Sequence, residues 1–217
     1  MNVYTSVQSF FDEKRLRYAG AVILLVGLLV GMWFGYKWYQ KGKEQLAFKD
    51  LAESVDAYTS ATAGTESKEK LMDSERAFLA GSVAHKSSSL YPFFLAFQAD
   101  ALIRLGKLVE AAEQLDSALA AMDKRNPLYY LYALKTALVN IDTKDATREQ
   151  RGRVLLDSLS TDVANPLQEM ALVYSGLDAR ARGEKSLALT KFNDVLARSK
   201  KDSFWRQLVE MKLKSGD

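Results

Sequence analysis

The longest apolar run in the chain covers residues 18–36, which read YAGAVILLVGLLVGMWFGY and carry no charge. As a helix rising about 1.5 Å per residue, these nineteen residues span roughly 28 Å, close to the hydrocarbon thickness of a bilayer. Nine of them are Val, Ile, Leu or Phe, which together favour membrane insertion by about 4 kcal/mol. Only a helix satisfies its own backbone hydrogen bonds in lipid, so the run predicts a transmembrane helix over residues 18–39, with membrane lipid as its partner.

Aromatic residues lie at both ends of this run, where a membrane helix places its interfacial anchors. The set comprises Tyr18 at one end and Trp33, Phe34, Tyr36, Trp38 and Tyr39 at the other. These bulky residues argue against a cleaved signal peptide, whose apolar core is shorter and is followed by small residues. A buried core helix is the other alternative, but apolar residues all round the helix fit lipid better. We therefore expect a retained, single-pass anchor.

Three glycines inside the run, Gly27, Gly31 and Gly35, follow one another at intervals of four residues. They form two overlapping GxxxG frames on one helix face, a pattern that lets a second membrane helix approach closely. The pattern predicts a helix–helix contact, either in a homo-oligomer or with a larger membrane protein. The alternative is that glycine is simply common in membrane helices, and the sequence leaves both interpretations open.

After residue 43 the apolar residues take the spacing of soluble amphipathic helices, and helix starts recur along the chain. The three prolines, Pro92, Pro127 and Pro166, lie 35 and 39 residues apart, and the last two follow asparagine. Asparagine as N-cap with proline in the first helical position is a helix-start signal, because the side-chain oxygen accepts an unpaired N–H. A further start is expected at residues 202–203, capping a helix from Phe204. A period of this length is typical of a helical repeat array.

Within the repeats, glycine and alanine recur in a pattern that resembles the tetratricopeptide (TPR) repeat. The matching runs are Leu102-x₂-Leu105-Gly106-x₄-Ala111-x₃-Leu115-x₂-Ala118-Leu119 and Gly176-x₆-Gly183-x₄-Ala188-x₃-Phe192. In that repeat a glycine makes the turn, and small alanines let the paired helices pack closely. We expect helices over residues 92–105, 108–122, 128–141 and 148–159. The middle unit lacks the glycine turn, and we interpret it as a degenerate repeat with a capping box over Thr147-Arg148-Glu149-Gln150.

These elements predict an all-α fold: an N-terminal transmembrane helix followed by TPR-like antiparallel helical hairpins, forming an α-solenoid with a C-terminal capping helix. We expect a short tail over residues 1–17, the membrane helix over 18–39 and the repeat domain over 40–217. The positive-inside rule does not orient the anchor, because three basic residues lie close to each side of it. They are Lys14, Arg15 and Arg17 before the run, and Lys37, Lys41 and Lys43 after it.

Composition limits the chemistry that the chain can perform. A net charge of +3, with charges of both signs interspersed, does not favour nucleic acid as a partner. The chain has no cysteine and a single histidine, His85, so disulfides, thiol nucleophiles and zinc sites built on several histidines are excluded. It also lacks a phosphate-binding glycine loop. We expect no enzymatic activity, no cofactor and no bound metal, and we interpret His85 as a solvated residue at a helix end.

Five short stretches mark the layout of the chain. They are Ser9-Phe10-Phe11, Trp33-x₂-Tyr36, Ala111-Ala112-x-Gln114-Leu115, Gly183-Glu184-Lys185 and Glu210-Met211-Lys212. With these stretches, nearly the whole chain resembles the bacterial ancillary subunit of the Sec translocon, a family of single-pass inner-membrane proteins with a periplasmic TPR-like domain. The resemblance implies a cytosolic N-terminus, repeats in the periplasm, association with the Sec channel, and contacts with periplasmic chaperones or client polypeptides.

A TPR-like array curls so that one set of helices lines a concave face, and such faces usually bind peptides. Aromatic residues are candidates for these contacts, and we single out Phe93, Tyr129 and Tyr132. Tyr129 and Tyr132 lie three residues apart on one helix face, and tyrosine tolerates a wet groove. The alternative for aromatic residues at this spacing is packing in the core between hairpins.

The expected function is that of a membrane-anchored, TPR-like adaptor at the Sec translocon, which contacts translocating or folding polypeptides and chaperones in the periplasm. Anchoring would raise the effective concentration of a weak binding surface near the channel. The alternative is a structural scaffold or assembly subunit of a membrane or cell-envelope complex, which oligomerises through the glycines of the apolar run and the edges of the repeats. A third arrangement places the repeats in the cytosol, which the balance of flanking charges permits.

Overall fold

The structure is a computed structural model that describes residues 13–63 and 67–214, with side chains described at Leu29 and from Gly31 onward. All regular structure within these ranges is helical, which confirms the predicted all-α class. The helices are α2 (Glu13–Thr62), α3 (Lys68–Ala84), α4 (Tyr91–Arg104), α5 (Leu108–Ala121), α6 (Tyr129–Asp142), α7 (Ala146–Thr161), α8 (Gln168–Ala181), α9 (Lys185–Arg198) and α10 (Phe204–Lys214). Of the expected tail, residues 1–12 lie outside the described part of the chain.

The chain divides into two compact units, Met1–Phe48 and Lys49–Asp217. The first unit holds the N-terminal part of α2, which is helical throughout the predicted span. No helix among the described residues is both long enough and apolar enough to cross a bilayer. The residues of the predicted span before Leu29 have no described side chains, so the transmembrane helix stays a prediction.

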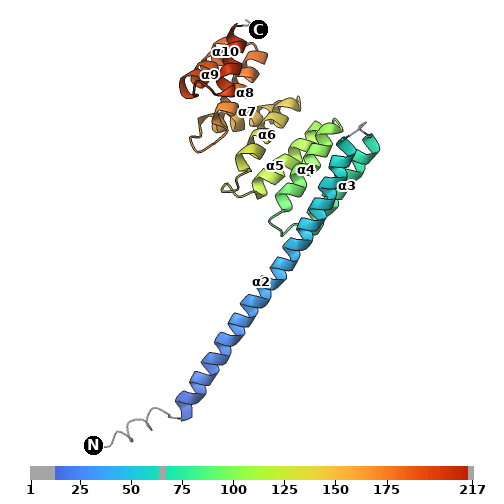
Figure 1. Cartoon of the computed structure of the whole chain (residues 1–217), viewed down its shortest axis with the longest axis vertical. Helices are drawn as coiled ribbons and strands as arrows, with labels where there is room; N and C mark the ends of the chain where they lie inside the picture. Colours follow the sequence, from blue (N-terminus) through green and yellow to red (C-terminus); the bar gives the residue numbers. More distant parts are fainter. Residues whose placement is uncertain (1–12, 64–66, 215–217) are drawn as a thin grey trace, which may run out of the picture. The chain divides into compact units, whose positions relative to one another are not determined.

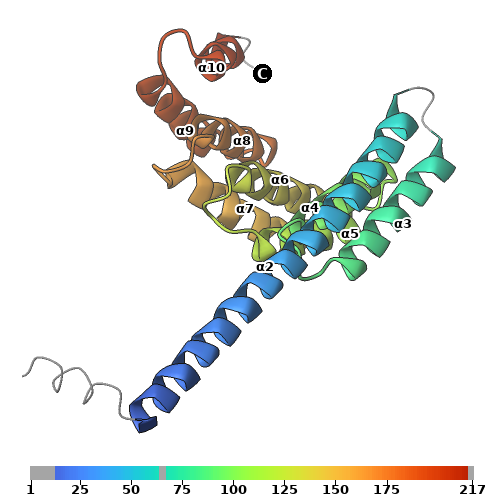
Figure 2. The ribbon, with the colours of Figure 1, turned by 60° about the horizontal axis from the view of Figure 1, so that its bottom comes forward.

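In the described part of the second unit, helical hairpins follow one another and α10 closes the series (Figures 1 and 2). The first hairpin pairs the C-terminal end of α2 with α3, where the rings of Tyr58 and Phe78 lie 6.0 Å apart. The others are α4–α5, α6–α7 and α8–α9, and each packs against the next. Helix α10 packs against α8 and α9. These pairs confirm the predicted helical hairpins, and their packing is consistent with a solenoid.

Two of the hairpins turn on glycine, as the sequence predicts. Gly106, between α4 and α5, and Gly183, between α8 and α9, have φ of +75° and +81°, a left-handed conformation that glycine adopts without steric cost. Lys144 takes the matching place between α6 and α7, with φ of +59°. A residue with a side chain loses about 1–2 kcal/mol in this conformation, so the middle hairpin keeps the same turn geometry at some cost in stability.

The starts of α4, α6 and α8 share one local structure. The side-chain oxygens of Ser88, Asn126 and Asn165 each accept a hydrogen bond from the N–H two residues later, at 3.0, 2.9 and 2.9 Å. These turns lie 38 and 39 residues apart, so they mark equivalent positions better than the prolines do. Pro92 lies inside the first turn of α4, whereas Pro127 and Pro166 precede their helices. The predicted placement at the helix start is therefore confirmed for Pro92, whereas Pro127 and Pro166 lie two residues before their helices.

The start of α7 differs from the capping box that the sequence predicts. Helix α7 begins at Ala146, and its N-cap is Asp145, whose carboxylate accepts the N–H of Arg148 at 2.9 Å. The predicted cap, Thr147, instead lies within the first turn of the helix. Asp145 is the N-cap, and Thr147 is not, because the backbone of Asp145 is extended. Its short carboxylate reaches the N–H three residues later, as an N-cap requires.

The middle hairpin lacks the turn glycine, as predicted for a degenerate repeat, and its second helix also begins earlier. Buried positions on the second helices of the hairpins share one spacing: Ala111, Leu115 and Ala118 in α5, Gly152, Leu156 and Leu159 in α7, and Ala188, Phe192 and Val195 in α9. Helices α5 and α9 begin three residues before the first of these positions, whereas α7 begins six residues before it. Helix α7 thus carries three additional residues at its start, and Gly152 takes the place of the small alanine.

The closing helix begins at Phe204, as the sequence predicts. The hydroxyl of Ser203, however, donates a hydrogen bond to the carboxylate of Glu169 in α8, 2.6 Å away, instead of capping α10. Val209 of α10 is buried in the last core cluster, and Trp205 packs against the same cluster. Helix α10 therefore covers the apolar face that α8 and α9 would otherwise expose.

Ion pairs connect equivalent helices of successive hairpins at separations of 34 or 35 residues. They are Asp100–Lys135, Glu113–Arg148, Asp116–Arg151 and Asp157–Lys191. In most of these pairs one partner is well exposed, so each contributes at most about 1 kcal/mol. Their constant separation shows that each hairpin stacks on the next with nearly the same offset.

Replacing Gly152 by alanine should lower the free energy of unfolding of the repeat domain by about 2–3 kcal/mol. A Cβ at this position would lie 2.5 Å from the backbone carbonyl oxygen of Ala137, and a backbone group in α6 cannot rotate out of the way. Urea denaturation followed by circular dichroism measures the change. The matched control is Gly42→Ala, because a Cβ at Gly42 meets nothing within 4 Å. Equal midpoints for the two variants would contradict the close approach of α6 and α7.

Candidate functional site

The described part of α2 carries an aromatic band, which we define as Trp33, Phe34, Tyr36, Trp38 and Tyr39. All five residues are exposed, and Trp38 reaches 81%. Because an α-helix turns once in about 3.6 residues, the unbroken exposure of residues 31–39 means that every side of this segment faces outward. The aromatic band therefore differs from the helices of the second unit, each of which buries one face.

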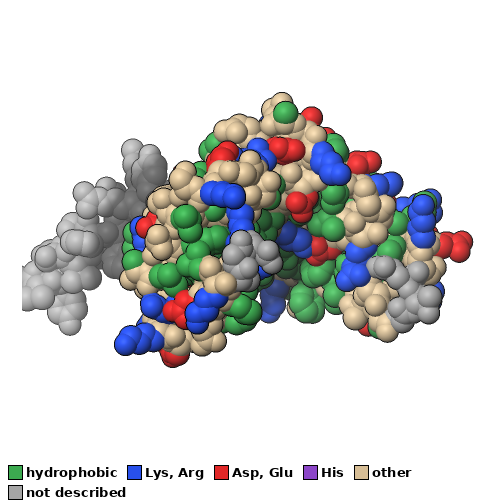
Figure 3. Space-filling view, turned by 90° about the horizontal axis from the view of Figure 1, so that it is seen from above, with side chains coloured by type: hydrophobic (Ala, Val, Ile, Leu, Met, Phe, Trp, Pro, Cys, Tyr) green, Lys and Arg blue, Asp and Glu red, His purple; other side chains and the backbone are tan. Residues whose placement is uncertain are grey.

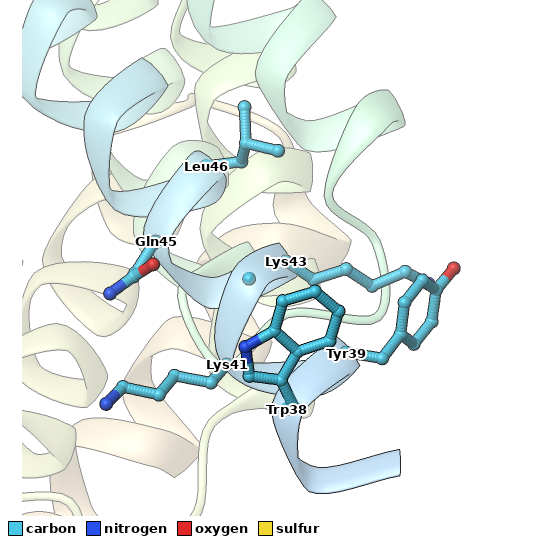
Figure 4. A pocket seen from close by; sticks show the side chains of 7 residues that line it. Trp38, Tyr39, Lys41, Lys43, Gln45 and Leu46 are labelled. Atoms are coloured by element: carbon cyan, nitrogen blue, oxygen red, sulfur yellow. The ribbon is translucent and has the colours of Figure 1, made fainter. Parts of the chain in front are cut away.

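Lysine side chains lie against two rings of the aromatic band. The ammonium of Lys37 is 4.1 Å from the centroid of the Trp33 ring, and that of Lys43 is 4.7 Å from the centroid of the Tyr39 ring. Figure 4 shows Lys43 extending toward Tyr39, whereas Lys41 points to another side of the helix. Both contacts are within the range of cation–π attraction. Rings and positive charges thus lie at the same level along the helix.

The predicted helix–helix contact falls partly within the described residues. Adding a Cβ at Gly31 or Gly35 would bring it within 4 Å of no other atom, so this face of α2 is open. Gly27 lies outside the described side chains. The two described glycines therefore leave room for a second helix, and whether one binds stays a prediction.

The three predicted peptide-contact residues separate into two places. The rings of Phe93 and Tyr132 lie 6.1 Å apart, so the structure brings these two together across α4 and α6. Tyr129 instead lies 5.5 Å from the ring of Tyr130 and packs against the core cluster shared by α6, α7 and α8. All of these rings are half-buried, and Tyr129 and Tyr132 therefore do not form one contact surface.

Two tyrosines of α6 have hydroxyls that are harder to ionise than usual. Burial raises the pKa of Tyr132, and the nearby Asp100 carboxylate raises it further. The pKa of Tyr130 is also raised, chiefly because its hydroxyl donates a hydrogen bond to the Asp162 carboxylate, 3.0 Å away. In both cases the surroundings favour the neutral ring, as is typical of tyrosines that take part in packing.

The exposed apolar residues at the start of α6 are leucines, which the sequence analysis did not select. Leu128 and Leu131 are 42% and 47% exposed. Leu131 follows its helix-start turn by five residues, as Phe93 does in α4 and Met170 does in α8. We call Phe93, Leu131 and Met170 the apolar line. Aligning the chain on the Ser and Asn turns, instead of on the prolines, would have revealed it.

Charges of both signs are mixed over the surface. Figure 3 shows acidic and basic side chains interspersed with hydrophobic ones on the face it presents. Some of the charges pair locally, as where the Arg125 guanidinium lowers the pKa of the exposed Asp123 to about 2. This mixing agrees with the small net charge of +3 and gives the face no dominant sign.

His85 is not the solvated residue that the sequence analysis described. Its side chain is only 14% exposed, and its ring stacks on Phe94 with centroids 5.6 Å apart. The Nε2 atom lies 2.7 Å from the carboxylate of Asp50 in α2. Since a carboxylate only accepts, Nε2 carries the proton of this hydrogen bond. The interpretation of His85 as solvated was wrong because the end of α3 packs against Phe94 of α4 and Asp50 of α2. The local sequence does not reveal the contact with Asp50, which is 35 residues away.

Replacing Tyr132 by phenylalanine should make the repeat domain less sensitive to alkaline pH. A group whose pKa is raised by folding contributes stability that is present below its unfolded pKa of 10.0 and is lost as the pH rises through the folded value. The free energy of unfolding of the wild-type chain should therefore fall more steeply above about pH 10 than that of Tyr132→Phe. Denaturation with urea at a series of pH values measures both slopes. Parallel curves would mean that Tyr132 is a solvated contact residue instead of a packed one.

Taken together, the described residues offer surfaces for non-covalent contacts: the aromatic band, the open glycine face and the exposed Leu128 and Leu131. Within the described ranges, no group of three or more His, Asp or Glu side chains is placed to hold a metal ion. Compared with models of protein families, with characterised proteins and with solved structures, the chain has no significant match.

Proposed function

We propose that the protein is a single-pass membrane protein whose repeat domain acts as an adaptor for other proteins. The aromatic band carries this proposal, because its side chains are exposed on every side of α2 and lysines lie against two of its rings. In membrane helices, aromatic residues gather at the level of the lipid headgroups, and lysines there extend their charge toward water. The uncharged run of residues 18–36 ends within the band, as it would if the band marked one membrane surface.

Water is an unfavourable surrounding for this segment. Large apolar residues exposed on the described part of α2 include Leu29, Met32, Leu46 and Phe48, besides the aromatic band. Continuous apolar surfaces of this kind usually mark a site of contact with a membrane or a protein. Lipid satisfies all sides of one helix at once, which a single protein partner does not. This argument favours the membrane.

The adaptor role follows from the form of the repeat domain. Successive hairpins stack at a nearly constant offset, and the exposed Leu128 and Leu131 give the stack an apolar surface at the start of α6. Such surfaces bind other polypeptides in repeat proteins. A membrane anchor confines this surface to a thin layer, which raises its effective concentration toward partners in the same membrane.

We further propose, from the resemblance, that the partner is the Sec translocon of the bacterial inner membrane. The N-terminus would then lie in the cytosol and the repeats in the periplasm, where they would contact periplasmic chaperones and translocating or folding polypeptides. The described hairpins support the layout on which the resemblance depends, with an N-terminal helix leading into repeats and a closing helix.

A second candidate function is that of a scaffold for a membrane or cell-envelope complex. It is favoured by the open face at Gly31 and Gly35, where a second helix would meet no obstructing atom. In this case α2 would associate with another copy of itself and the repeat edges would extend the assembly. The two functions differ in what accompanies the protein when it is extracted in detergent.

Membrane insertion is tested by Gly27→Asp, at the middle of the uncharged run of residues 18–36. A carboxylate near the centre of a membrane helix costs up to about 2.5–3.5 kcal/mol, and its short side chain cannot reach the headgroups. We expect this variant to move largely from the membrane fraction to the soluble or aggregated fraction of bacterial cells. Gly42→Asp is the matched control, since it introduces the same carboxylate on the same helix but beyond the apolar run. Wild-type protein that is fully soluble without detergent would overturn the proposal.

Topology and partner are tested on the same cells. Protease added to spheroplasts should degrade the repeat domain while the inner membrane is intact, and detergent extracts should retain the Sec channel with the full chain. Repeats that are degraded only after lysis of the inner membrane would contradict the periplasmic orientation. Extracts that contain homo-oligomers without the Sec channel would favour the scaffold.

A further inference from the structure

Helices α8, α9 and α10 border a cavity of about 200 Å³ that is separate from the apolar line. We call it the α9–α10 groove. Its floor is apolar and consists of Ala188, Leu189 and Phe192 of α9 with Leu213 of α10. Phe192 is only 2% exposed, and its ring is held against Gly176, where an added Cβ would come within 2.5 Å of it. Leu189 is 49% exposed, so part of this apolar lining is accessible to a ligand.

The charged residues of the groove are all basic. Arg180, Lys185 and Lys212 line it, and no acidic side chain of the described residues does so. Arg180 and Lys185 form no ion pair with any residue in the described ranges. Nearby cations outside the groove are different, because Arg182 pairs with Asp178 at 3.1 Å and Lys191 pairs with Asp157 at 2.5 Å. The groove therefore combines apolar lining residues with two positive charges, those of Arg180 and Lys185, that neighbouring carboxylates do not neutralise.

The size of the groove limits what can fill it. Sites for drug-sized ligands and cofactors usually enclose about 300–1,000 Å³, more than this groove holds. A volume of about 200 Å³ suits one large aliphatic or aromatic side chain. An acyl chain of a lipid would need a longer apolar channel than this groove, which two cationic side chains, Arg180 and Lys185, also line.

We infer that the α9–α10 groove binds an extended segment of another polypeptide in which an apolar side chain is flanked by carboxylates. The apolar side chain covers Leu189 and lies on Phe192, and the carboxylates accept hydrogen bonds from Arg180 and Lys185. Charge-assisted hydrogen bonds of this kind give orientation, and burial of the side chain gives the remaining affinity. The inference rests on the proposed contact with polypeptides, and it names their chemistry, but it does not depend on the membrane anchor.

The test uses the full chain in detergent micelles and a fluorescein-labelled peptide with the sequence Glu-Leu-Glu between Gly-Ser spacers. Fluorescence anisotropy should show tighter binding of this peptide than of Gln-Leu-Gln and Glu-Ser-Glu versions. The double variant Arg180→Glu/Lys185→Glu should weaken binding about tenfold or more, because two attractive charges become repulsive. The control is Arg198→Glu/Lys200→Glu, which changes the net charge equally but lies outside the groove.

Several outcomes would overturn the inference. Equal binding of the three peptides, or equal losses in both double variants, would mean that the groove does not recognise the segment. Binding of phosphatidylglycerol vesicles that depends on Arg180 and Lys185, without binding of the peptide, would assign the groove to lipid. Circular dichroism checks that each variant is folded, and Lys185→Glu alone, at an exposed position, repeats the test with less risk to the fold. A chain that binds the peptide but is found outside the membrane would refute the anchor and leave the groove intact.

Discussion

The stack of hairpins depends on close approach between helices at positions where one of them has no side chain. Gly81 of α3 faces the ring of Phe94, Gly176 of α8 faces the ring of Phe192, and Gly152 of α7 faces the backbone of α6. At each of these places an added Cβ would lie 2.2–2.5 Å from its neighbour, which no packed structure accommodates. The large ring or the helix backbone fills the space that glycine leaves. Two of these contacts lie within hairpins and one joins α3 to α4. Close packing against glycine therefore occurs both inside a hairpin and between successive hairpins.

Much of the fold can be read from local sequence, because its signals act over a few residues. The glycine turns at Gly106 and Gly183 are visible as such, since their left-handed conformation suits glycine. The role of Gly152 is not visible, because a glycine inside a helix identifies a close contact only once the facing helix is known. The cap at Asp145 was missed for a different reason: Asp145 and Thr147 are both good caps, and only the structure shows that Asp145 has the extended backbone that a cap requires.

The candidate surfaces were harder to predict than the fold. Tyr129 and Tyr132 lie on the same helix with the same chemistry, yet one packs among α6, α7 and α8 and the other lies beside Phe93 of α4. Leu131, which is more exposed than either, looks from the sequence like a core residue. A period of three or four residues shows which side chains share a helix face, but not whether another helix covers that face. His85 makes the same point, because its partner Asp50 is 35 residues away.

The position of α10 has a consequence for how the array comes apart. In a linear stack each hairpin is held only by its neighbours, so the ends fray while the middle stays closed. Helix α10 is short, and its contribution to the last cluster is centred on Val209 and Trp205. A polypeptide bound between α9 and α10 would hold α10 against the last hairpin and so reduce fraying at this end of the array. Slower hydrogen exchange in α10 would then report occupancy of the groove from inside the fold.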